Sequence, residues 1–471
     1  MLQQLGLLPM GWLLIALIAV FASIAFFVGR VGAERILMSG APTLHSRPNY
    51  HGYFVAMWAV VPAILVALAY AVGAEPFARG QLTGELPPAF ELLTGPELTT
   101  YLDSVAQAAR STDYAGTDLV FSAVTNRYLE ILGGLNMGAL ALMAIGALCG
   151  LLFARRRLTA AFRARSLVEQ GMEGVLFLCA VVAIATTVGI ITSLLYESIQ
   201  FFNVVPIWDF LFGTRWNAQT EAEFGALPLF FGTFMIALIA MLVAAPIGLF
   251  SAIYLSEYAG PKTRAWIKPI LEILAGIPTV VYGFFALLVV APAVRSLAIW
   301  INETLINIGL ASEPLLAAQP TSALAAGLVM GIMVIPFVSS LSDDVINAVP
   351  QTLRDGAYAL GATKSETVRN VVVPAALPGI IAALLLAVSR AIGETMIVVM
   401  AAGKSARISM DPTSDLTTIT VQIVSLMTGE TGFDDPKTLS AFALGLVLFA
   451  VTLIFNVIAL RVVQKYREKY D

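Results

Sequence analysis

Long apolar runs separated by short polar segments make up most of the chain. An α-helix needs about twenty consecutive apolar residues to cross the hydrocarbon core of a bilayer. Nine runs are close to that length, and each predicts a membrane-spanning helix, so the expected fold class is an all-α polytopic membrane protein. The runs cover residues 10–29, 53–73, 131–154, 173–199, 226–255, 267–291, 321–341, 378–402 and 438–461.

One long polar insertion, residues 75–130, interrupts the first part of the chain. It contains Pro87-Pro88 and then a pattern typical of an amphipathic helix over Glu97–Ala109. A small folded cap and a disordered segment are both consistent with this composition. We expect residues 1–165 to form an N-terminal extension with about three spans and this insertion, and its sequence shows no chemical motif.

Composition agrees with a membrane protein. Of the 471 residues, 58% are hydrophobic and only 12% are charged, with a mean hydropathy of +0.85. Soluble domains carry about a quarter charged residues, so a soluble protein is excluded, and we expect no nucleic-acid partner. Cys149 and Cys179 lie in apolar spans and the only histidines, His45 and His51, share one polar loop, so we predict neither a disulfide nor a metal site. No basic residue precedes the run from Met10, which predicts a retained helix instead of a cleaved signal peptide.

The distribution of Lys and Arg predicts the orientation in the membrane. If the C-terminal tail is cytoplasmic, 18 of the 27 basic residues lie on the cytoplasmic side, 8 lie outside and Arg390 lies within a span. Cytoplasmic segments of membrane proteins carry the excess of basic residues. We therefore expect a periplasmic N-terminus, a cytoplasmic C-terminus and a cytoplasmic loop over residues 341–377.

This predicted cytoplasmic loop carries the signals of two short helices. Pro350 suits the first position of a helix, and Gly361 suits the position just past its end. Thr363 and Glu366 have the spacing of a capping box, so we expect a second helix that runs to Pro374. The predicted unit is a helix, a glycine hinge and a helix, held outside the membrane between two spans.

The spacing within the loop resembles the coupling-loop signature of ABC importer permeases, which reads Glu-Ala-Ala, three residues, Gly, nine residues, Ile-x-Leu-Pro. The residue types are relaxed, with Asp for Glu, Gly for the first Ala and Val for both Ile and Leu. The matching positions are Asp355, Gly356, Ala357, Gly361, Val371, Val373 and Pro374. The resemblance implies that a separate ATPase subunit grips these residues.

Two further stretches narrow the resemblance. Residues 389–396 and 271–283 are closely similar to the phosphate-specific ABC importer permeases. Met396, which follows Gly-Glu-Thr, is more typical of the PstC-type subunit than of its PstA-type partner. The resemblance covers about residues 170–465.

The resemblance implies a type I ABC importer permease fold over residues 166–471, with about six core transmembrane helices, in addition to the three of the extension. It implies a multi-pass protein of the cell inner membrane, surrounded by membrane lipid. The implied partners are a PstA-type permease subunit in a heterodimer, two ATPase subunits, a periplasmic phosphate-binding protein and inorganic phosphate as cargo. A PstA-like sister subunit and a permease for another oxyanion are the alternatives.

Arg390 and Glu394 are the candidate residues of the substrate path. At 1.5 Å per residue, Arg390 lies about 18 Å along its helix from Pro378, close to the middle of a hydrocarbon core about 30 Å thick. A central Arg costs about 2.5–3.5 kcal/mol even on insertion scales, which indicates a function. We expect Glu394, four residues on, to lie on the same helix face. A buried ion pair that locks this helix to its neighbours is the structural alternative.

The functional interpretation is an anion site, because an arginine presents a planar fork of donors that matches phosphate oxygens. Our hypothesis is that Glu394 holds Arg390 when the site is empty. It would also accept a hydrogen bond from the protonated oxygen of hydrogen phosphate, which sulfate lacks. In the phosphate permeases the matching Arg and Glu are regarded as functionally important, and the resemblance carries this over to Arg390 and Glu394.

Other charged residues near the spans have simpler interpretations. Glu272 follows Lys268 by four residues, which predicts an interfacial pair. Glu257 and Arg264 bracket what looks like an ordinary turn between spans.

Proline and glycine are expected to break two spans. Pro246 and Gly248 interrupt one of them, and Gly276 and Pro278 interrupt the next. Broken helices at membrane depth are tolerated where they line a cavity or pack on neighbours, and both interpretations stay open here.

The sequence contains no energy-transducing site. Gly403-Lys404-Ser405 matches the end of a phosphate-cradling loop, but Val398 stands where the first glycine is required. We therefore expect no catalytic residue and no cofactor in this chain, and ATP hydrolysis on a separate ATPase subunit. An ion-driven secondary transporter would need a proton or ion relay, and only Arg390 and Glu394 are central. A membrane enzyme would need a nucleophile with a base or a metal cluster, and no such set is evident.

Overall fold

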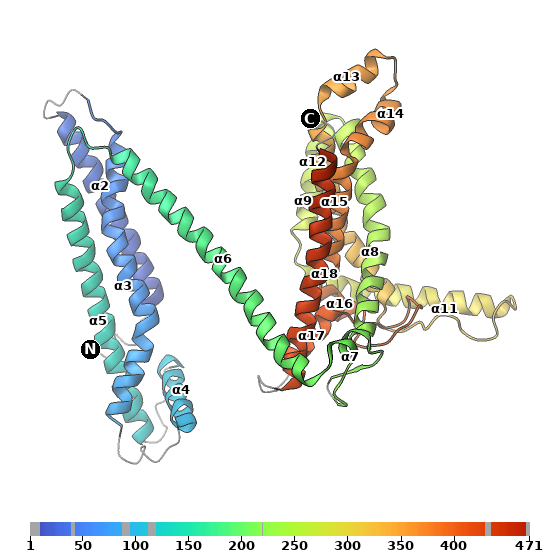
Figure 1. The fold of residues 1–471 in the computed structure, drawn as a ribbon, viewed down its shortest axis with the longest axis horizontal. Coiled ribbons are helices and arrows are strands. Elements are labelled where there is room, and N and C mark those ends of the chain that lie inside the picture. Colours follow the sequence, from blue (N-terminus) through green and yellow to red (C-terminus); the bar gives the residue numbers. More distant parts are fainter. Residues whose placement is uncertain are drawn as a thin grey trace. The chain divides into compact units, whose positions relative to one another are not determined.

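The structure is a computed structural model, and it describes residues 10–38, 43–86, 95–111, 119–218, 220–428 and 435–467. The chain forms two compact units, Met1–Ala185 and Thr186–Asp471 (Figure 1). Among the described residues, nine helices are long and apolar enough to cross a membrane, which confirms the all-α class and the predicted number of spans. Helix α6 (Ala164–Val204) contains the division between the units. The domain boundary predicted at residue 165 stays a prediction.

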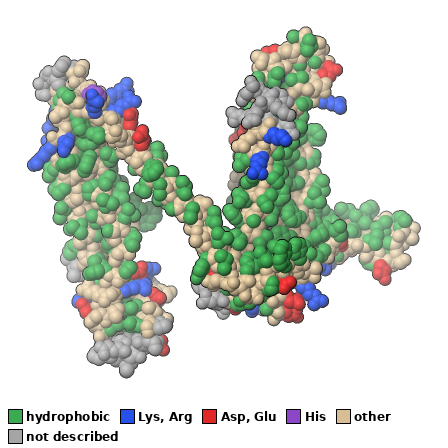
Figure 2. Space-filling model, in the orientation of Figure 1, with side chains coloured by type: hydrophobic (Ala, Val, Ile, Leu, Met, Phe, Trp, Pro, Cys, Tyr) green, Lys and Arg blue, Asp and Glu red, His purple; other side chains and the backbone are tan. Residues whose placement is uncertain are grey.

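The helices of each unit expose apolar side chains along their length. Figure 2 shows hydrophobic side chains over the long helices and charged side chains gathered near helix ends. Large side chains are open, with Phe177 72% and Phe250 70% exposed. Apolar surface of this extent is typical of a protein that faces hydrocarbon or a partner subunit.

The first unit packs three long helices side by side. Gly29 faces the backbone carbonyl of His51, and Gly150 faces that of Trp58, so a Cβ at either glycine would overlap the neighbouring helix. Small residues allow such close approach between membrane helices. The three helices are α2 (Met10–Met38), α3 (Pro48–Gly84) and α5 (Leu119–Arg156).

Helix α4 (Gly95–Ser111) confirms the amphipathic helix predicted in the polar insertion. Its buried Leu102 and Val105 pack against α3 and α5. Arg79 of α3 pairs with Asp103 of α4, with 2.7 Å between Nη1 and Oδ1. This stretch is therefore folded, and the disordered alternative is wrong for it, whereas Pro87-Pro88 lies outside the described residues.

After α6, the second unit contains the remaining spans, several short helices and one β-hairpin, in which Trp216 lies opposite Phe224. The elements before its central helix are α7 (Ile207–Phe212), β1 (Trp216–Asn217), β2 (Glu223–Phe224), α8 (Leu227–Ile253), the π-helical turn η2 (Tyr254–Tyr258), α9 (Pro261–Ala275), α10 (Thr279–Phe285), the π-helical turn η3 (Ala286–Val290) and α11 (Ala291–Asn307). The others are α12 (Ala323–Ala348), α13 (Gln351–Ala359), α14 (Lys364–Thr367), the π-helical turn η4 (Val368–Val372), α15 (Val373–Ile392), α16 (Met396–Ala401), α17 (Ile419–Met427) and α18 (Pro436–Arg467).

Helix α12 is the central element of the second unit. In its most apolar 18-residue stretch, 61% of the residues are buried, the largest share among the candidate spans of the described chain. It packs closely along α8, because Gly331 of α12 meets the carbonyl of Ala240 and Gly248 of α8 meets Val338. Gly248 therefore serves close packing. Pro246 lies inside the continuous α8 and does not interrupt it, contrary to the expectation.

The expectation of a single span over residues 267–291 is wrong. Helix α9 ends at Ala275, Gly276 caps it, and α10 begins after Pro278, which confirms the predicted break. A candidate span runs over Thr279–Asn307 instead. The reason is the proline, which disfavours helical geometry in the residue before it and has no N–H to donate.

Candidate functional site

The predicted cytoplasmic loop folds as two short helices, α13 and α14, separated by Gly361. Gly361 has a φ of +86°, a left-handed conformation that is costly for a residue with a Cβ. Its N–H donates to the carbonyl of Tyr358 (2.9 Å), and the N–H of Ala362 donates to that of Ala357 (3.1 Å). These two bonds form a Schellman motif, so the predicted position of Gly361 just past the helix end is confirmed.

The second helix begins as predicted and ends elsewhere. Thr363 Oγ1 accepts from the N–H of Glu366 (3.4 Å), and Glu366 Oε2 accepts from the N–H of Thr363 (2.8 Å), so the predicted capping box is present. The expected end at Pro374 is wrong, because one helical run continues over Lys364–Ile392. The π-helical turn η4 shifts the hydrogen-bonding pattern just before the proline. Pro374 therefore falls in the first turn of α15, where its missing N–H is tolerated.

Helix α13 is attached to the unit by Arg354, a residue that the sequence did not single out. Its buried guanidinium donates to the carbonyls of Ile346 (Nη2, 2.8 Å) and Val349 (Nη1, 2.5 Å). Nη2 also lies 3.0 Å from Oε1 of Glu257 in η2. The two partners are 97 positions apart in the chain, so no local pattern could have indicated the pair.

The other face of α13 is open. Leu360, at its C-terminal end, is 91% exposed, which leaves an apolar contact available to a protein partner. The predicted coupling positions divide as follows: Asp355, Gly356, Gly361 and Pro374 are exposed, Val371 and Val373 are half-buried, and Ala357 is buried. One face of α13 is thus anchored while the other presents part of the predicted signature.

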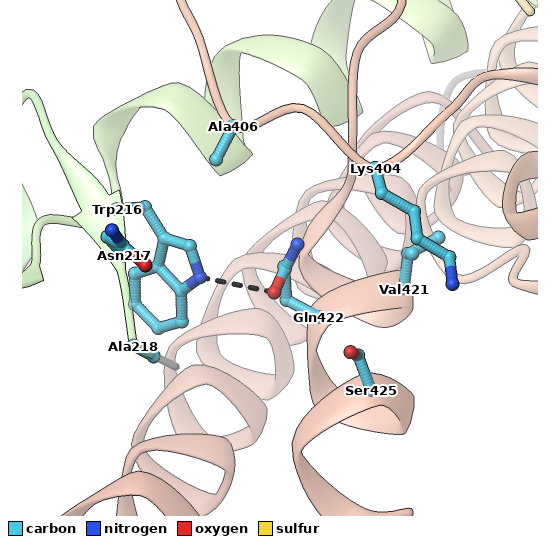
Figure 3. A pocket seen from close by; sticks show the side chains of 8 residues that line it. All are labelled: Trp216, Asn217, Ala218, Lys404, Ala406, Val421, Gln422 and Ser425. Atoms are coloured by element: carbon cyan, nitrogen blue, oxygen red, sulfur yellow. Dashed lines mark hydrogen bonds between the residues drawn. The ribbon is translucent and has the colours of Figure 1, made fainter. Parts of the chain in front are cut away.

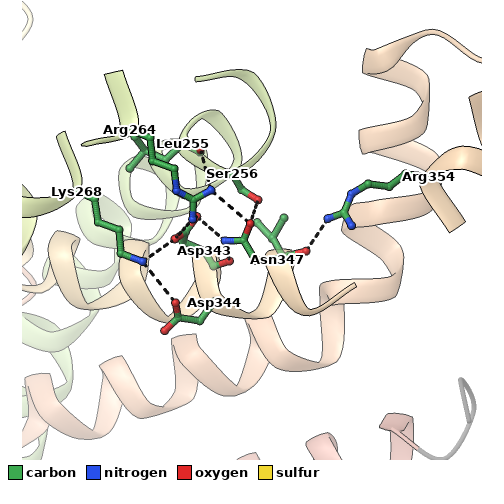
Figure 4. A network of polar contacts seen from close by, with 9 residues as sticks. Leu255, Ser256, Arg264, Lys268, Asp343, Asp344, Asn347 and Arg354 are labelled. Carbon is green, nitrogen blue, oxygen red and sulfur yellow. Dashed lines mark hydrogen bonds and ion pairs between the residues drawn. The ribbon is translucent and has the colours of Figure 1, made fainter. Parts of the chain in front are cut away.

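A second buried carboxylate, Asp343 of α12, lies near this anchor (Figure 4). Arg264 Nη2 donates to both of its oxygens, at 3.0 and 2.8 Å, and Lys268 Nζ donates to Oδ2 at 3.1 Å. Asn347 Nδ2 donates to Oδ1 at 2.9 Å. The hydrogen bond to Asp343 raises the pKa of Lys268. These contacts join α9 to α12.

This network corrects the expectation for Lys268. Lys268 pairs with Asp343, and the described residues contain no Lys268–Glu272 pair. A buried carboxylate is the stronger partner, because leaving it without a cation would be costly. The interpretation of Glu257 and Arg264 as parts of an ordinary turn was incomplete, since each pairs with a charge far along the chain.

The span predicted at residues 378–402 is interrupted near its middle. Helix α15 ends at Ile392 with Gly393 as its cap, and α16 begins at Met396. A glycine followed by polar residues is a recognised signal for the end of one helix and the start of another. That signal was present at Gly393 and could have identified the break.

Glu394 lies inside this break and holds it. Its Oε1 accepts from the N–H groups of Met396 (3.0 Å) and Ile397 (3.4 Å), where a carboxylate satisfies the free donors of a helix start. Its backbone carbonyl accepts from Oγ1 of Thr420 in α17 (2.9 Å). The break is therefore fixed by both the side chain and the backbone of Glu394.

Arg390 lies in the last turn of α15 with an exposed side chain. Its guanidinium carbon is 5.7 Å from the ring centroid of Phe337 in α12, a cation–π distance. No ion pair to Arg390 occurs within the described part of the chain. The expectation that Glu394 shares its helix face and holds it is wrong for this structure, because the helix ends between them and Glu394 caps α16 instead.

Phe337 also borders a cavity. The cavity has a volume of about 220 Å³, and its lining includes Phe337, Lys268 and Asp343. The aromatic ring that contacts Arg390 thus lines the same cavity as the network at the end of α12.

Two family profiles match the chain. Residues 15–186 match a family described as a phosphate ATP-binding cassette transporter. Residues 244–468 match a family described as a binding-protein-dependent transport system inner membrane component. The first match covers the extension in which the sequence showed no chemical motif.

Several proteins are similar over more than half of the chain. The probable ABC transporter permease YqgH of Bacillus subtilis is 32% identical over 303 residues, which cover 64% of this chain and 92% of that protein. The phosphate transport system permease PstC of Mesorhizobium japonicum is 36% identical, covering 54% of this chain and 77% of that protein. The PstC permease of Xylella fastidiosa is 37% identical, and the alignment covers 55% of this chain and 80% of that protein. The structure of an inward-facing MetNI methionine ABC transporter aligns with 51% of this chain. The alignment covers 94% of the transporter chain, at 17% identity and a TM-score of 0.34.

Proposed function

Because the chain belongs to the PstC family of ABC transporter permeases, we infer that it is the membrane-spanning translocation subunit of an ATP-driven importer of inorganic phosphate. It is a multi-pass inner-membrane protein, and as a permease it is not itself an enzyme. The structural observation that best supports an anion path is Arg390, a guanidinium without an ion pair among the described residues, next to the break between α15 and α16.

We propose that Arg390 binds phosphate during passage. A guanidinium whose charge is not already compensated can donate two parallel hydrogen bonds to phosphate oxygens. Phe337 supports it from one side through the cation–π contact, and this leaves the planar donor edge for the anion. The cavity that Phe337 shares with the α12 network is the space into which the anion would then move.

We propose that Glu394 contributes selectivity. One carboxylate oxygen, Oε1, is committed to the backbone of α16. The other, Oε2, accepts no hydrogen bond from the described residues, so it can accept one from the protonated oxygen of hydrogen phosphate. Sulfate has no such proton at neutral pH and would meet only the repulsion between two negative charges.

We also propose the other subunits of the importer. A periplasmic phosphate-binding protein delivers the anion, two ATPase subunits hydrolyse ATP, and a PstA-type permease completes the membrane pair. The exposed face of α13 with Gly361 supports contact with an ATPase, because α13 is anchored on its opposite face by Arg354. The orientation that fits has a periplasmic N-terminus and a cytoplasmic C-terminus.

Uptake of labelled phosphate by the reconstituted complex tests this function. Wild type should take up phosphate in an ATP-dependent manner, and Arg390→Gln should lower the rate at least tenfold. Arg390→Lys should retain an intermediate rate. Arg295→Gln removes an exposed arginine of α11 that lacks an ion pair among the described residues, and should transport normally.

A permease for another oxyanion is the second candidate, because the cargo is first selected by the binding protein. Uptake of labelled sulfate in place of phosphate by the same complex would favour it. Phosphate uptake with normal rates in Arg390→Gln would instead remove Arg390 from the path.

A further inference from the structure

A small polar pocket lies in the second unit, separate from Arg390 (Figure 3). Its volume is about 160 Å³, and it is formed by the β-hairpin, the loop after α16 and helix α17. The polar side chains of its described lining are Trp216, Asn217, Lys404, Gln422 and Ser425. They include one cation and no carboxylate.

The wall of the pocket is preformed. Trp216 Nε1 donates to Oε1 of Gln422 (3.1 Å), and Gln422 Nε2 donates to Oγ1 of Thr417 (3.3 Å). Trp216 is itself almost buried in the hairpin core. Figure 3 shows Lys404 and Ser425 on the side of Gln422 away from the hairpin. The two side chains therefore lie beside a fixed surface.

Lys404 supplies the positive charge of the pocket. Its exposed ammonium forms no ion pair with any described residue. The nearby Asp415 is already engaged, with 2.6 Å from its Oδ1 to Nη2 of Arg407 and a further short hydrogen bond from Ser405. A free cation next to neutral donors attracts anions and leaves them exchangeable.

Helix α17 connects this pocket to the break that Glu394 holds. Thr420 of α17 donates to the Glu394 carbonyl. Ser425 lies five residues further, about 8 Å along the helix axis. An anion in the pocket would thus be separated from the break by about one and a half helical turns.

We propose that this pocket is an entry site, where Lys404 holds the phosphate anion beside the Trp216–Gln422 wall before it reaches Arg390. The proposal rests on the proposed function and on the orientation that places this face in the periplasm. A single exposed ammonium binds an anion weakly, which suits a position from which the anion must leave in each cycle.

Chemical labelling tests the site without relying on transport. In the purified complex, an amine-reactive reagent should modify Lys404, and inorganic phosphate should slow this modification at least threefold relative to chloride at equal ionic strength. Lys262, an exposed lysine elsewhere in the second unit, is the internal control and should be unaffected. Equal modification of Lys404 in both salts would overturn the proposal.

Uptake by variants then tests the role. Lys404→Gln should lower the phosphate uptake rate about fivefold at saturating loaded binding protein, and Lys404→Arg should retain most of it. Arg215→Gln, which removes a charge from the same hairpin outside the pocket, should behave as wild type. The affinity of the complex for the binding protein should stay within twofold in all three.

The outcomes separate this proposal from the function on which it rests. If wild type moves no phosphate, the proposed function fails, and labelling still decides the site. If wild type transports and Lys404→Gln equals it, only the entry site fails. If Lys404→Gln acts solely by weakening association with the binding protein, the pocket is a docking contact and the entry site is likewise overturned.

Discussion

Arg354 of α13 and Glu257 of η2 form a buried ion pair, with 3.0 Å between Nη2 and Oε1 and side chains only 10% and 8% exposed. The pair joins the helix that faces the ATPase in our proposal to the end of α8. Because α8 packs along the central α12, a displacement of α13 has a direct route into the core of the second unit.

Removing only Arg354 should destabilise the protein more than removing both Arg354 and Glu257. Arg354→Met leaves the Glu257 carboxylate buried without a cation, which typically costs about 3–5 kcal/mol. The double variant Arg354→Met, Glu257→Leu should recover much of that loss. Thermal unfolding of the purified protein measures it, and a double variant less stable than Arg354→Met would contradict the role of the pair.

Loss of Asp343 should lower the free energy of unfolding by less than loss of Arg354. Asp343→Ala removes the shared acceptor, but Arg264 and Lys268 are about one third exposed and water can solvate them. We expect a loss of about 1–3 kcal/mol in stability. Asp344→Ala, which removes the 3.7 Å contact of an exposed neighbour, is the matched control and should have little effect.

The Lys268–Asp343 pair has a defined pH dependence. Asp343 raises the pKa of Lys268 above its usual value near 10.5. The charged lysine therefore contributes its stability fully below that value and loses it only as the pH rises through the higher folded-state pKa. The difference in free energy of unfolding between wild type and Lys268→Met measures the contribution of this pair. This difference should be constant from about pH 6 to 9 and should fall only at more alkaline pH. A decline around neutral pH would be inconsistent with it.

Gly361 and Gly356 form a matched pair of substitutions. An added Cβ would meet nothing within 4 Å at either position, but only Gly361 has a positive φ. Gly361→Ala should therefore destabilise by about 1 kcal/mol, and Gly361→Val by more. Gly356→Ala, inside a helix, should stabilise by about 0.5–1 kcal/mol. ATPase copurification should be lost in Gly361→Val, and its full retention would argue against coupling through this turn.

Glu394→Gln tests selectivity apart from structure. The amide oxygen of Gln can still cap α16 through the N–H groups of Met396 and Ile397, so the break should persist. In our proposal this change removes the negative charge that repels sulfate, so discrimination between phosphate and sulfate should fall about tenfold. Competition of sulfate against labelled phosphate uptake gives the ratio, and unchanged selectivity would exclude Glu394 from recognition.

Features set by a few consecutive residues could be predicted from the sequence. The capping box of Thr363 and Glu366 and the left-handed Gly361 depend on contacts within one or two turns, and both are confirmed. The number of spans follows from the length of apolar runs alone. The roles of Arg390 and Glu394 in transport stay predictions.

Features set by distant residues could not be predicted. Lys268 has an acidic residue four positions on, yet its partner is Asp343, 75 positions away. Arg354 looks like an ordinary loop arginine until Glu257 is brought to it by the fold. Sequence spacing reports neighbours on one helix, whereas burial decides which charges must be paired.

The π-helical turn η4 allows Pro374 to sit inside one unbroken helix from Lys364 to Ile392. Between Lys364 and Arg390 this helix spans about 39 Å at 1.5 Å per residue. In our proposal, an ATPase that displaces the first turn of this helix would therefore also displace the guanidinium of Arg390 at its other end. Over this length, a tilt of about four degrees at Lys364 becomes a shift of about 3 Å at Arg390.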